Sequence, residues 1–252
     1  MNKKKLKNAL IGHTGFIGSN LKNLKKNFSY FNSYNIHKIE RKKYESIYCA
    51  GTYSKIWIAN KKPLEDRKNI DKLIKHLRRV DAKKFFLISS SEVYGNQKKT
   101  FENSKIDNVK KKPYAYNRLK LEKFVEKKFS KHFIVRLPIV YGKNFVKNFI
   151  FDLISKKNIK NLNGNDYVQI YNVSNLQNHL KFIEKENIRK INISSKPFKV
   201  KYLAKKFFGV LLKNKKKFRI INIKSIYGSH NKTYFLSQIK TIEDLKKFLK
   251  KK

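Results

Sequence analysis

The chain has 252 residues, a length that suits one α/β domain or one large domain with a small addition. Its 62 Lys and Arg residues against 17 Asp and Glu residues give a formal net charge of +45. The cations run through every segment, alongside abundant Asn, Ile, Tyr and Phe, which indicates compositional bias with a solvated surface. We do not expect a nucleic-acid partner, although a polyanion-binding surface remains the alternative explanation of this charge.

Cys49 is the only cysteine, which excludes a disulfide within the chain and favours a reducing compartment. No apolar run approaches the roughly 20 residues that cross a bilayer. The N-terminal lysines precede only a short apolar strand and a glycine loop, unlike a signal peptide. We therefore expect a cytoplasmic protein without a membrane partner. The six histidines are scattered, so no metal site is predicted.

Short apolar runs alternate with amphipathic helical stretches, the pattern of a parallel sheet wrapped by helices. Up to residue 137 we expect strands at 8–11, 28–31, 46–49, 85–88 and 133–137, and helices at 16–26, 63–80 and 113–129. After Gly142 the signals weaken, and we expect a strand at 191–193 and helices near 145–155, 200–208 and 241–250. The predicted fold class is α/β, a Rossmann-type doubly wound parallel sheet.

A glycine-rich loop, GHTGFIG at residues 12–18, joins the first expected strand to the helix after it. Gly12 permits the tight turn, Gly15 lets the backbone approach a pyrophosphate, and Gly18 lets the helix pack on the sheet. The start of the helix offers N–H groups and a positive dipole end to phosphates. The loop predicts dinucleotide binding, with these contact residues: Gly12, Thr14, Gly15, Phe16, Ile17 and Gly18.

The group that would hold the adenosine ribose is expected at the end of the second strand. An acidic residue is usual there, but Asn32 occupies the place, and Lys38 and Arg41 follow. Small polar groups with nearby cations tolerate a 2′-phosphate, so the sequence leaves both NAD and NADP open.

Three later segments accompany the glycine loop. They are FLISSSEVYG at 86–95, PYAYNRLKLE at 113–122 and RLPIVYG at 136–142. Together with the loop they resemble the extended branch of the short-chain dehydrogenase/reductase superfamily, the NAD-dependent epimerases and dehydratases. The resemblance covers residues 7–155 well and the remainder only loosely. It implies a nicotinamide cofactor and a nucleotide-activated sugar or related hydroxy or keto substrate.

The chemistry of this family needs a tyrosine that exchanges a proton with the substrate hydroxyl. A free phenol has a pKa of about 10 and is a poor base at neutral pH. A cation one helical turn along, on the same face, lowers that value and holds the nicotinamide ribose. A Ser or Thr at a strand end supplies the second hydrogen bond, and Ser90 matches that residue of the family.

Two tyrosines compete for the catalytic place. Tyr116 and Lys120 satisfy the literal Y-x-x-x-K pattern. The wider context PYAxNRLxxE is instead similar to PYGxSKLxxE of the family, which puts Tyr114 in the catalytic place and Arg118 where lysine belongs. We favour Tyr114 with Arg118, and the resemblance makes both of them cofactor contacts as well. Arginine departs from the family, because its side chain is bulkier and forked.

Further site residues follow from the same resemblance. Glu92 lies in a segment similar to the strand end of UDP-glucuronate decarboxylases and of dehydratases, where a glutamate acts on the sugar; a polar loop residue is the equal alternative. Ala50 and Gly51 follow the third strand, where small residues let the cofactor approach, and Ser89 completes the implied cofactor contacts. Cys49 is expected to be a packed core thiol.

The leading hypothesis is an NAD(P)-dependent epimerase, dehydratase or reductase, and the alternative is a non-catalytic dinucleotide-binding or regulatory protein of the same fold. No repeat or linker marks a boundary, so we expect a single Rossmann-like domain over residues 1–252. Within it, residues 143–252 would contribute a reduced substrate-binding region. Relatives commonly pair through the helices that correspond to 113–129 and to the one near Phe145, which implies a homodimer.

Overall fold

The computed structural model describes residues 6–52, 56–95, 98–106, 109–228 and 233–251. The chain forms two compact units. Unit 1 comprises Met1–Gly95, Ile106–Arg136 and Asn175–Ile191, and unit 2 comprises Asn96–Lys105, Leu137–Ser174 and Asn192–Lys252. Because each unit is assembled from several stretches of the chain, no single cut along the sequence separates them.

Unit 1 is built around a sheet with the strand order β10-β6-β4-β3-β1-β2. These strands are β1 (Asn8–Ile11), β2 (Phe28–Phe31), β3 (Lys43–Cys49), β4 (Asp81–Ser90), β6 (His132–Leu137) and β10 (Lys190–Asn192). β1 pairs in parallel with both β2 and β3, and β3 pairs in parallel with β4. The order therefore reverses between β1 and β3, which is where open α/β sheets bind their ligands.

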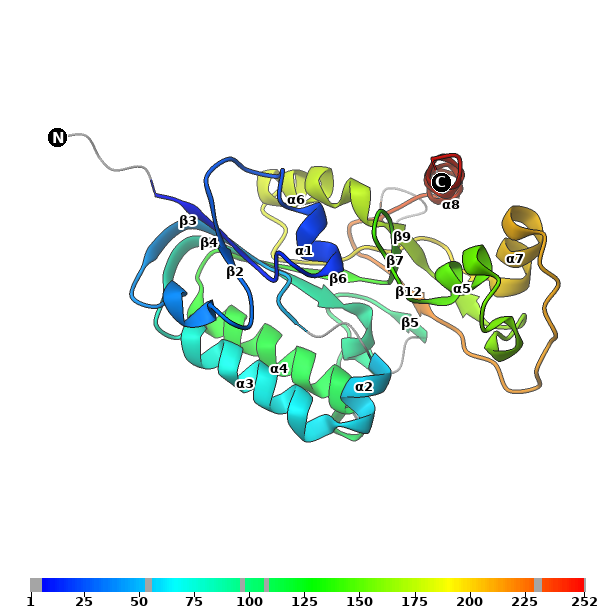
Figure 1. Cartoon of the computed structure of the whole chain (residues 1–252), viewed down its shortest axis with the longest axis horizontal. Helices are drawn as coiled ribbons and strands as arrows, with labels where there is room; N and C mark the ends of the chain where they lie inside the picture. Colours follow the sequence, from blue (N-terminus) through cyan, green and yellow to red (C-terminus); the bar gives the residue numbers. More distant parts are fainter. Residues whose placement is uncertain (1–5, 53–55, 96–97, 107–108, 229–232, 252) are drawn as a thin grey trace. The chain divides into compact units, whose positions relative to one another are not determined.

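Helices cover both faces of this sheet (Figure 1). One face carries α3 (Pro63–Leu77) and α4 (Pro113–Lys128), and the other carries α1 (Phe16–Asn20) and α6 (Leu176–Lys185). α2 (Ile56–Lys61) packs against α3 and α4. The buried core includes apolar side chains of β3, β4, α3 and α4, such as Ile47, Phe85, Leu73 and Leu121. The predicted Rossmann-type doubly wound sheet is confirmed.

Unit 2 consists of short elements. Its strand pairs are β5 (Lys98–Thr100) with β12 (Asn222–Ile223), β7 (Ile139–Tyr141) with β9 (Ile170–Asn172), and β8 (Tyr167–Val168) with β11 (Phe198–Lys199). Its helices are α5 (Phe149–Ser155), α7 (Val200–Phe208) and α8 (Gln238–Leu249). Tyr141 and Phe145 both pack edge-on against Phe248 of α8. In the described part of the chain, no helix is both long and apolar enough to span a membrane.

Single-turn 3₁₀ helices occur in both units. They are η1 (Ile36–Ile39), η2 (Ser91–Tyr94), η3 (Val109–Lys111), η4 (Ile159–Asn161) and η5 (Val173–Asn175). η2 is the one that matters for the site, because it begins directly after β4 and packs against α4.

The bounds of β1, β2 and α7 match the sequence predictions, but the first helix is shorter than expected. It ends at Asn20 rather than at Lys26. The Ser19 hydroxyl and the Asn20 amide both donate to the Phe16 carbonyl, at 2.9 and 2.8 Å. Such side chains compete for the carbonyls of a helix, and both residue types are weak helix formers.

Other expected elements differ at their ends. β3 begins at Lys43 and β4 extends over Asp81–Ser90, both longer than predicted, whereas α5 begins only at Phe149. The sequence prediction missed α2 and α6. The second omission was avoidable, because the buried residues of α6 (Leu176, Leu180 and Ile183) follow helical spacing.

Candidate active site

The loop after β1 meets the loop after β3 at the point where the strand order reverses. The Gly12 N–H donates to the Phe31 carbonyl (2.7 Å), and the Ala50 N–H donates to the Ile11 carbonyl (2.9 Å). Gly12 has a φ of +83°, and a Cβ there would lie 2.5 Å from the Ala50 oxygen and 2.6 Å from the Gly51 Cα. The predicted cofactor residues Gly12, Ala50 and Gly51 are therefore brought together.

The other two loop glycines differ in what the protein itself requires of them. A Cβ on Gly18 would lie 2.1 Å from the Gly12 oxygen, so the fold excludes a side chain there. A Cβ on Gly15 would meet only that same oxygen, at 3.4 Å. Gly15 and Thr14 are exposed, and Phe16 and Ile17 are half-buried at the start of α1. Of the three loop glycines, Gly15 is the one where the protein leaves room for a side chain.

Asn32 stands directly after β2 and shapes the turn that follows. Its Oδ1 accepts from the N–H groups of Tyr34 (3.0 Å) and Asn35 (3.3 Å). The nearest acidic residue in the sequence, Glu40, is engaged by His76 (2.6 Å) and Arg79 (3.1 Å). The hydrogen bond from His76, and then that from Arg79, hold the pKa of Glu40 below its usual value.

The two hydroxyls at the end of β4 point to different partners. The Ser89 hydroxyl is buried and donates to Glu122 Oε1 (2.5 Å). The Ser90 hydroxyl accepts from the Glu92 N–H (3.2 Å) and so caps η2. A hydroxyl that accepts one hydrogen bond still has a proton to donate. Glu92 itself is half-buried in the first turn of η2.

Tyr114 and Arg118 lie on the buried side of α4, where they are 7% and 2% exposed. The Arg118 guanidinium carbon lies 4.5 Å from the centre of the Tyr114 ring. Arg118 Nη2 lies 2.8 Å from Asp66 Oδ1 of α3. The Tyr114 N–H donates to Asn60 Oδ1 of α2 (3.2 Å). Sequence reasoning missed Asp66 and Asn60, because nothing local connects either of them to α4.

The competing pair lies on a more exposed part of the same helix. Tyr116 is half-buried, and Lys120 forms an ion pair with Asp71 of α3, whose side chain is 45% exposed. Asp71 is also 3.8 Å from Arg67. α3 and α4 are thus joined by two ion pairs, a buried one at Arg118 and a half-exposed one at Lys120.

A second buried network fixes the end of β4 to α4 and β6. Arg136 donates to Glu122 through Nε (3.1 Å) and Nη2 (2.6 Å), and through Nη1 to the Tyr94 hydroxyl (2.7 Å). Burial lowers the pKa of the Arg136 guanidinium, but the charge and hydrogen bonds of Glu122 and Tyr94 reverse this and raise it above its ordinary value. The signal that was missed is Arg136, the one Arg, Lys, Asp or Glu residue in the apolar run of β6.

The side chains predicted to transfer protons and the loops predicted to hold a dinucleotide all lie in unit 1. Among the described residues, no group of three His, Cys, Asp or Glu side chains is placed to hold a metal ion.

Solved structures support the fold. The chain aligns with a dTDP-4-dehydrorhamnose reductase of Bacillus anthracis in complex with NADP, at 18% identity, over 100% of both chains, with a TM-score of 0.73. A second dTDP-4-dehydrorhamnose reductase, of Clostridium acetobutylicum, gives 15% identity over 97% of this chain and 99% of that one, with a TM-score of 0.72. A UDP-glucose 4-epimerase of Thermotoga maritima with UDP-glucose gives 15% identity over 97% of this chain and 100% of that one, with a TM-score of 0.66.

No curated protein sequence matches this chain. A model of the NAD dependent epimerase/dehydratase family matches residues 47–186, more than half of the 252 residues. The matched stretch includes the small residues Ala50 and Gly51 after β3, the η2 turn after β4 and the whole of α4. On this match, the chain belongs to the NAD dependent epimerase/dehydratase family.

Proposed function

We propose that the protein is an NAD(P)-dependent enzyme that acts as a reductase, epimerase or dehydratase on a nucleotide-activated sugar. The observation that carries the proposal is the meeting of the Gly12 loop with Ala50 and Gly51 at the reversal of strand order, in the same unit as Tyr114. The solved structures add support, since one holds NADP and another holds UDP-glucose.

The glycine loop fits a dinucleotide. Gly15 is exposed and leaves space that a side chain would fill, as close backbone approach to a pyrophosphate requires. Phe16 and Ile17 begin α1, and N–H groups at a helix start point toward a bound anion. Asn32 with exposed Lys38 and Arg41 supports acceptance of a 2′-phosphate, so NADP and NAD are both candidates.

In this proposal the cofactor supplies or accepts the hydride, and the protein handles the oxygen of the sugar. The Tyr114 hydroxyl moves the proton of the reacting hydroxyl or carbonyl. Ser90 donates the second hydrogen bond, with the proton that its bond from Glu92 leaves available. Glu92 lies in the same turn and is the candidate second acid or base when the reaction needs one.

Gly15→Val tests the cofactor site. NADH and NADPH are titrated by fluorescence against the wild type and the variant. We expect micromolar binding by the wild type and a loss of at least about tenfold in the variant, because the side chain occupies the pyrophosphate space. The thermal unfolding midpoint should be unchanged, since a Cβ there meets only the Gly12 oxygen, at 3.4 Å. Unchanged affinity in a folded variant would sink the proposed site.

Tyr114→Phe tests the reaction. Turnover of reduced and oxidised cofactor is measured with a panel of UDP- and dTDP-sugars. We expect Tyr114→Phe to lower kcat by roughly 10²- to 10⁴-fold, the contribution of a general acid or base. Tyr116→Phe is the matched control, two residues along the same helix, and should stay within about twofold of the wild type. The reverse result would assign the reaction to Tyr116 and Lys120.

A non-catalytic dinucleotide-binding protein is the second candidate. One observation favours it: the residue in the lysine place is an arginine already engaged by a buried carboxylate. Cofactor binding that depends on Gly15, without turnover of any sugar in the panel, would identify this class. A cytoplasmic location and a homodimer through α4 also remain proposals, and the second is argued below at the scale of the molecule.

A further inference from the structure

Two ion pairs join α3 to α4, and they differ in environment. Arg118 and Asp66 have side chains that are 2% and 3% exposed, whereas Lys120 and Asp71 are 34% and 45% exposed. An exposed pair contributes little, but a buried pair persists only when its geometry is well satisfied. The buried pair is therefore the one whose geometry the protein specifies.

Asp66 has two neighbouring donors from α4. Its Oδ1 is 2.8 Å from Arg118 Nη2, and its Oδ2 accepts from Asn117 Nδ2, also at 2.8 Å. A carboxylate held at both oxygens cannot rotate without breaking one of these bonds. Asn117 thus fixes the orientation of Asp66, and Asp66 in turn fixes the guanidinium.

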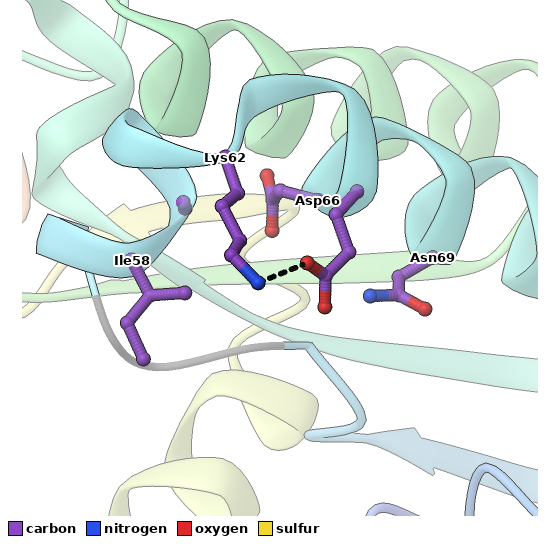
Figure 2. Close-up of a pocket in the computed structure, with 6 residues that line it drawn as sticks. Ile58, Lys62, Asp66 and Asn69 are labelled. Atoms are coloured by element: carbon purple, nitrogen blue, oxygen red, sulfur yellow. Dashed lines mark ion pairs between the residues drawn. The ribbon is translucent and has the colours of Figure 1, made fainter.

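Two other charged side chains near Asp66 are paired with each other. Asp66 borders a shallow hollow (Figure 2), lined by Ile58, Ala59, Lys62, Glu65, Asp66 and Asn69. The nearby cation, Lys62, pairs with Glu65 at 3.4 Å. That pair is exposed on both sides, so the solvent-facing charges compensate each other and Asp66 serves Arg118.

The guanidinium held in this way lies over the Tyr114 ring, 4.5 Å from its centre. Such a contact attracts a cation to the ring face and restricts the tilt of the ring. A flat guanidinium can stack on a ring and present a forked set of N–H groups to a carboxylate, a planar geometry that the compact ammonium of lysine lacks. This gives a physical reason for arginine at this position.

We propose that Asp66 and Asn117 are positioning residues, which hold Arg118 against Tyr114 so that Arg118 acts through the tyrosine ring rather than on the cofactor. The proposal rests on the proposed role of Tyr114. It predicts a separation of effects: weakening the pair lowers kcat and leaves the affinity for the dinucleotide unchanged.

Asp66→Asn is the first test, because it keeps the size of the side chain and removes its charge. Asp71→Asn is the matched control, on the same helix and in the other ion pair with α4. We expect Asp66→Asn to lower kcat by about tenfold or more with the dinucleotide Kd within twofold, and Asp71→Asn to change neither by more than twofold. An equal effect of the two variants, or a parallel loss of dinucleotide affinity, overturns the proposal.

A second readout does not need activity. In the wild type, the ring current of Tyr114 should move the NMR signals of the Arg118 side chain upfield, and Tyr114→Leu assigns this shift. We expect the shift to disappear in Asp66→Asn and to persist in Asp71→Asn. If the shift persists in folded Asp66→Asn, the proposal is overturned, whether or not the wild type turns over any sugar. A wild type that turns over no sugar counts separately, against the proposed function.

A buried arginine without its carboxylate can prevent folding, so a third variant replaces the whole pair. Asp66→Leu with Arg118→Met exchanges the ion pair for apolar side chains, a change that buried pairs often tolerate. We expect this protein to fold, to bind the dinucleotide with a Kd within twofold of the wild type, and to lose at least tenfold in kcat. Full turnover in the double variant overturns the proposal.

Discussion

Gly12 and Gly15 lie three residues apart, yet different demands act on them. At Gly12 the left-handed backbone and the Ala50 oxygen exclude any side chain, so the fold itself requires glycine there. At Gly15 the fold leaves room for a side chain, and the proposed dinucleotide is what would require glycine. The structure thus separates two roles that the glycine pattern alone presents together.

Cys49 provides a prediction at the same scale. It is fully buried at the end of β3, and burial raises the pKa of its thiol to about 11. At pH 8 the reactive thiolate is therefore scarce as well as inaccessible. We expect a thiol reagent to label the native protein slowly, and urea to accelerate labelling as the protein unfolds. Because this is the only cysteine, the signal has one source; complete labelling within seconds without urea would contradict the burial.

At the scale of elements, α4 joins most of unit 1 together. One turn of it contacts α2 and α3 through Tyr114 and Arg118, and the next contacts β4 and β6 through Glu122. Its buried side is consequently polar as well as apolar, which explains why its hydrophobic periodicity is weak although it is one of the best enclosed helices.

Glu122→Gln tests this account. Removal of one partner of a buried ion pair leaves Arg136 as an uncompensated buried charge, which costs about 3–5 kcal/mol of unfolding free energy. Glu126→Gln is the control, one turn along α4, where the Lys190 partner is 29% exposed. That loss should be below about 1 kcal/mol. Both are measured by urea unfolding, and equal losses would show that burial of the Glu122 pair is not what stabilises unit 1.

For the whole molecule, charge is the dominant property. A net charge of +45 means that two copies repel each other strongly at low ionic strength. Salt shortens the range of this repulsion, to about 10 Å at 0.1 M. Any homodimer formed through α4 must therefore become more stable as salt is added.

Light scattering at tens of micromolar protein tests the dimer. We expect a mass close to twice 30.0 kDa at about 0.3 M salt, with dissociation toward the monomer at about 0.02 M. Lys123 lies on the exposed part of α4, and Lys250 directly follows α8. Lys123→Glu should change the monomer–dimer equilibrium more than Lys250→Glu does. A monomeric mass at both salt concentrations would exclude the dimer.

The sequence by itself determined the features that depend on neighbours along the chain. Strand, glycine turn and helix follow one another within residues 8–20, so β1 and the loop could be predicted from local pattern alone. The frame PYAxNRLxxE likewise lies within a single helix. Its similarity to PYGxSKLxxE of the family is why Tyr114 and Arg118 were favoured, although the literal pattern selects Tyr116 and Lys120.

Only the tertiary structure decided which groups meet across the chain. Asp66 lies 52 residues before its partner Arg118. Glu102 lies 90 residues before Asn192, and its Oε1 accepts a hydrogen bond from the Asn192 N–H (2.7 Å). Nothing in local spacing encodes such pairs, because they form where separate helices and strands pack. The assembly of each unit from several stretches of the chain is of the same kind. Local sequence pattern predicts which residues are candidates for a site. Packing between distant segments decides which charged side chains contact those residues.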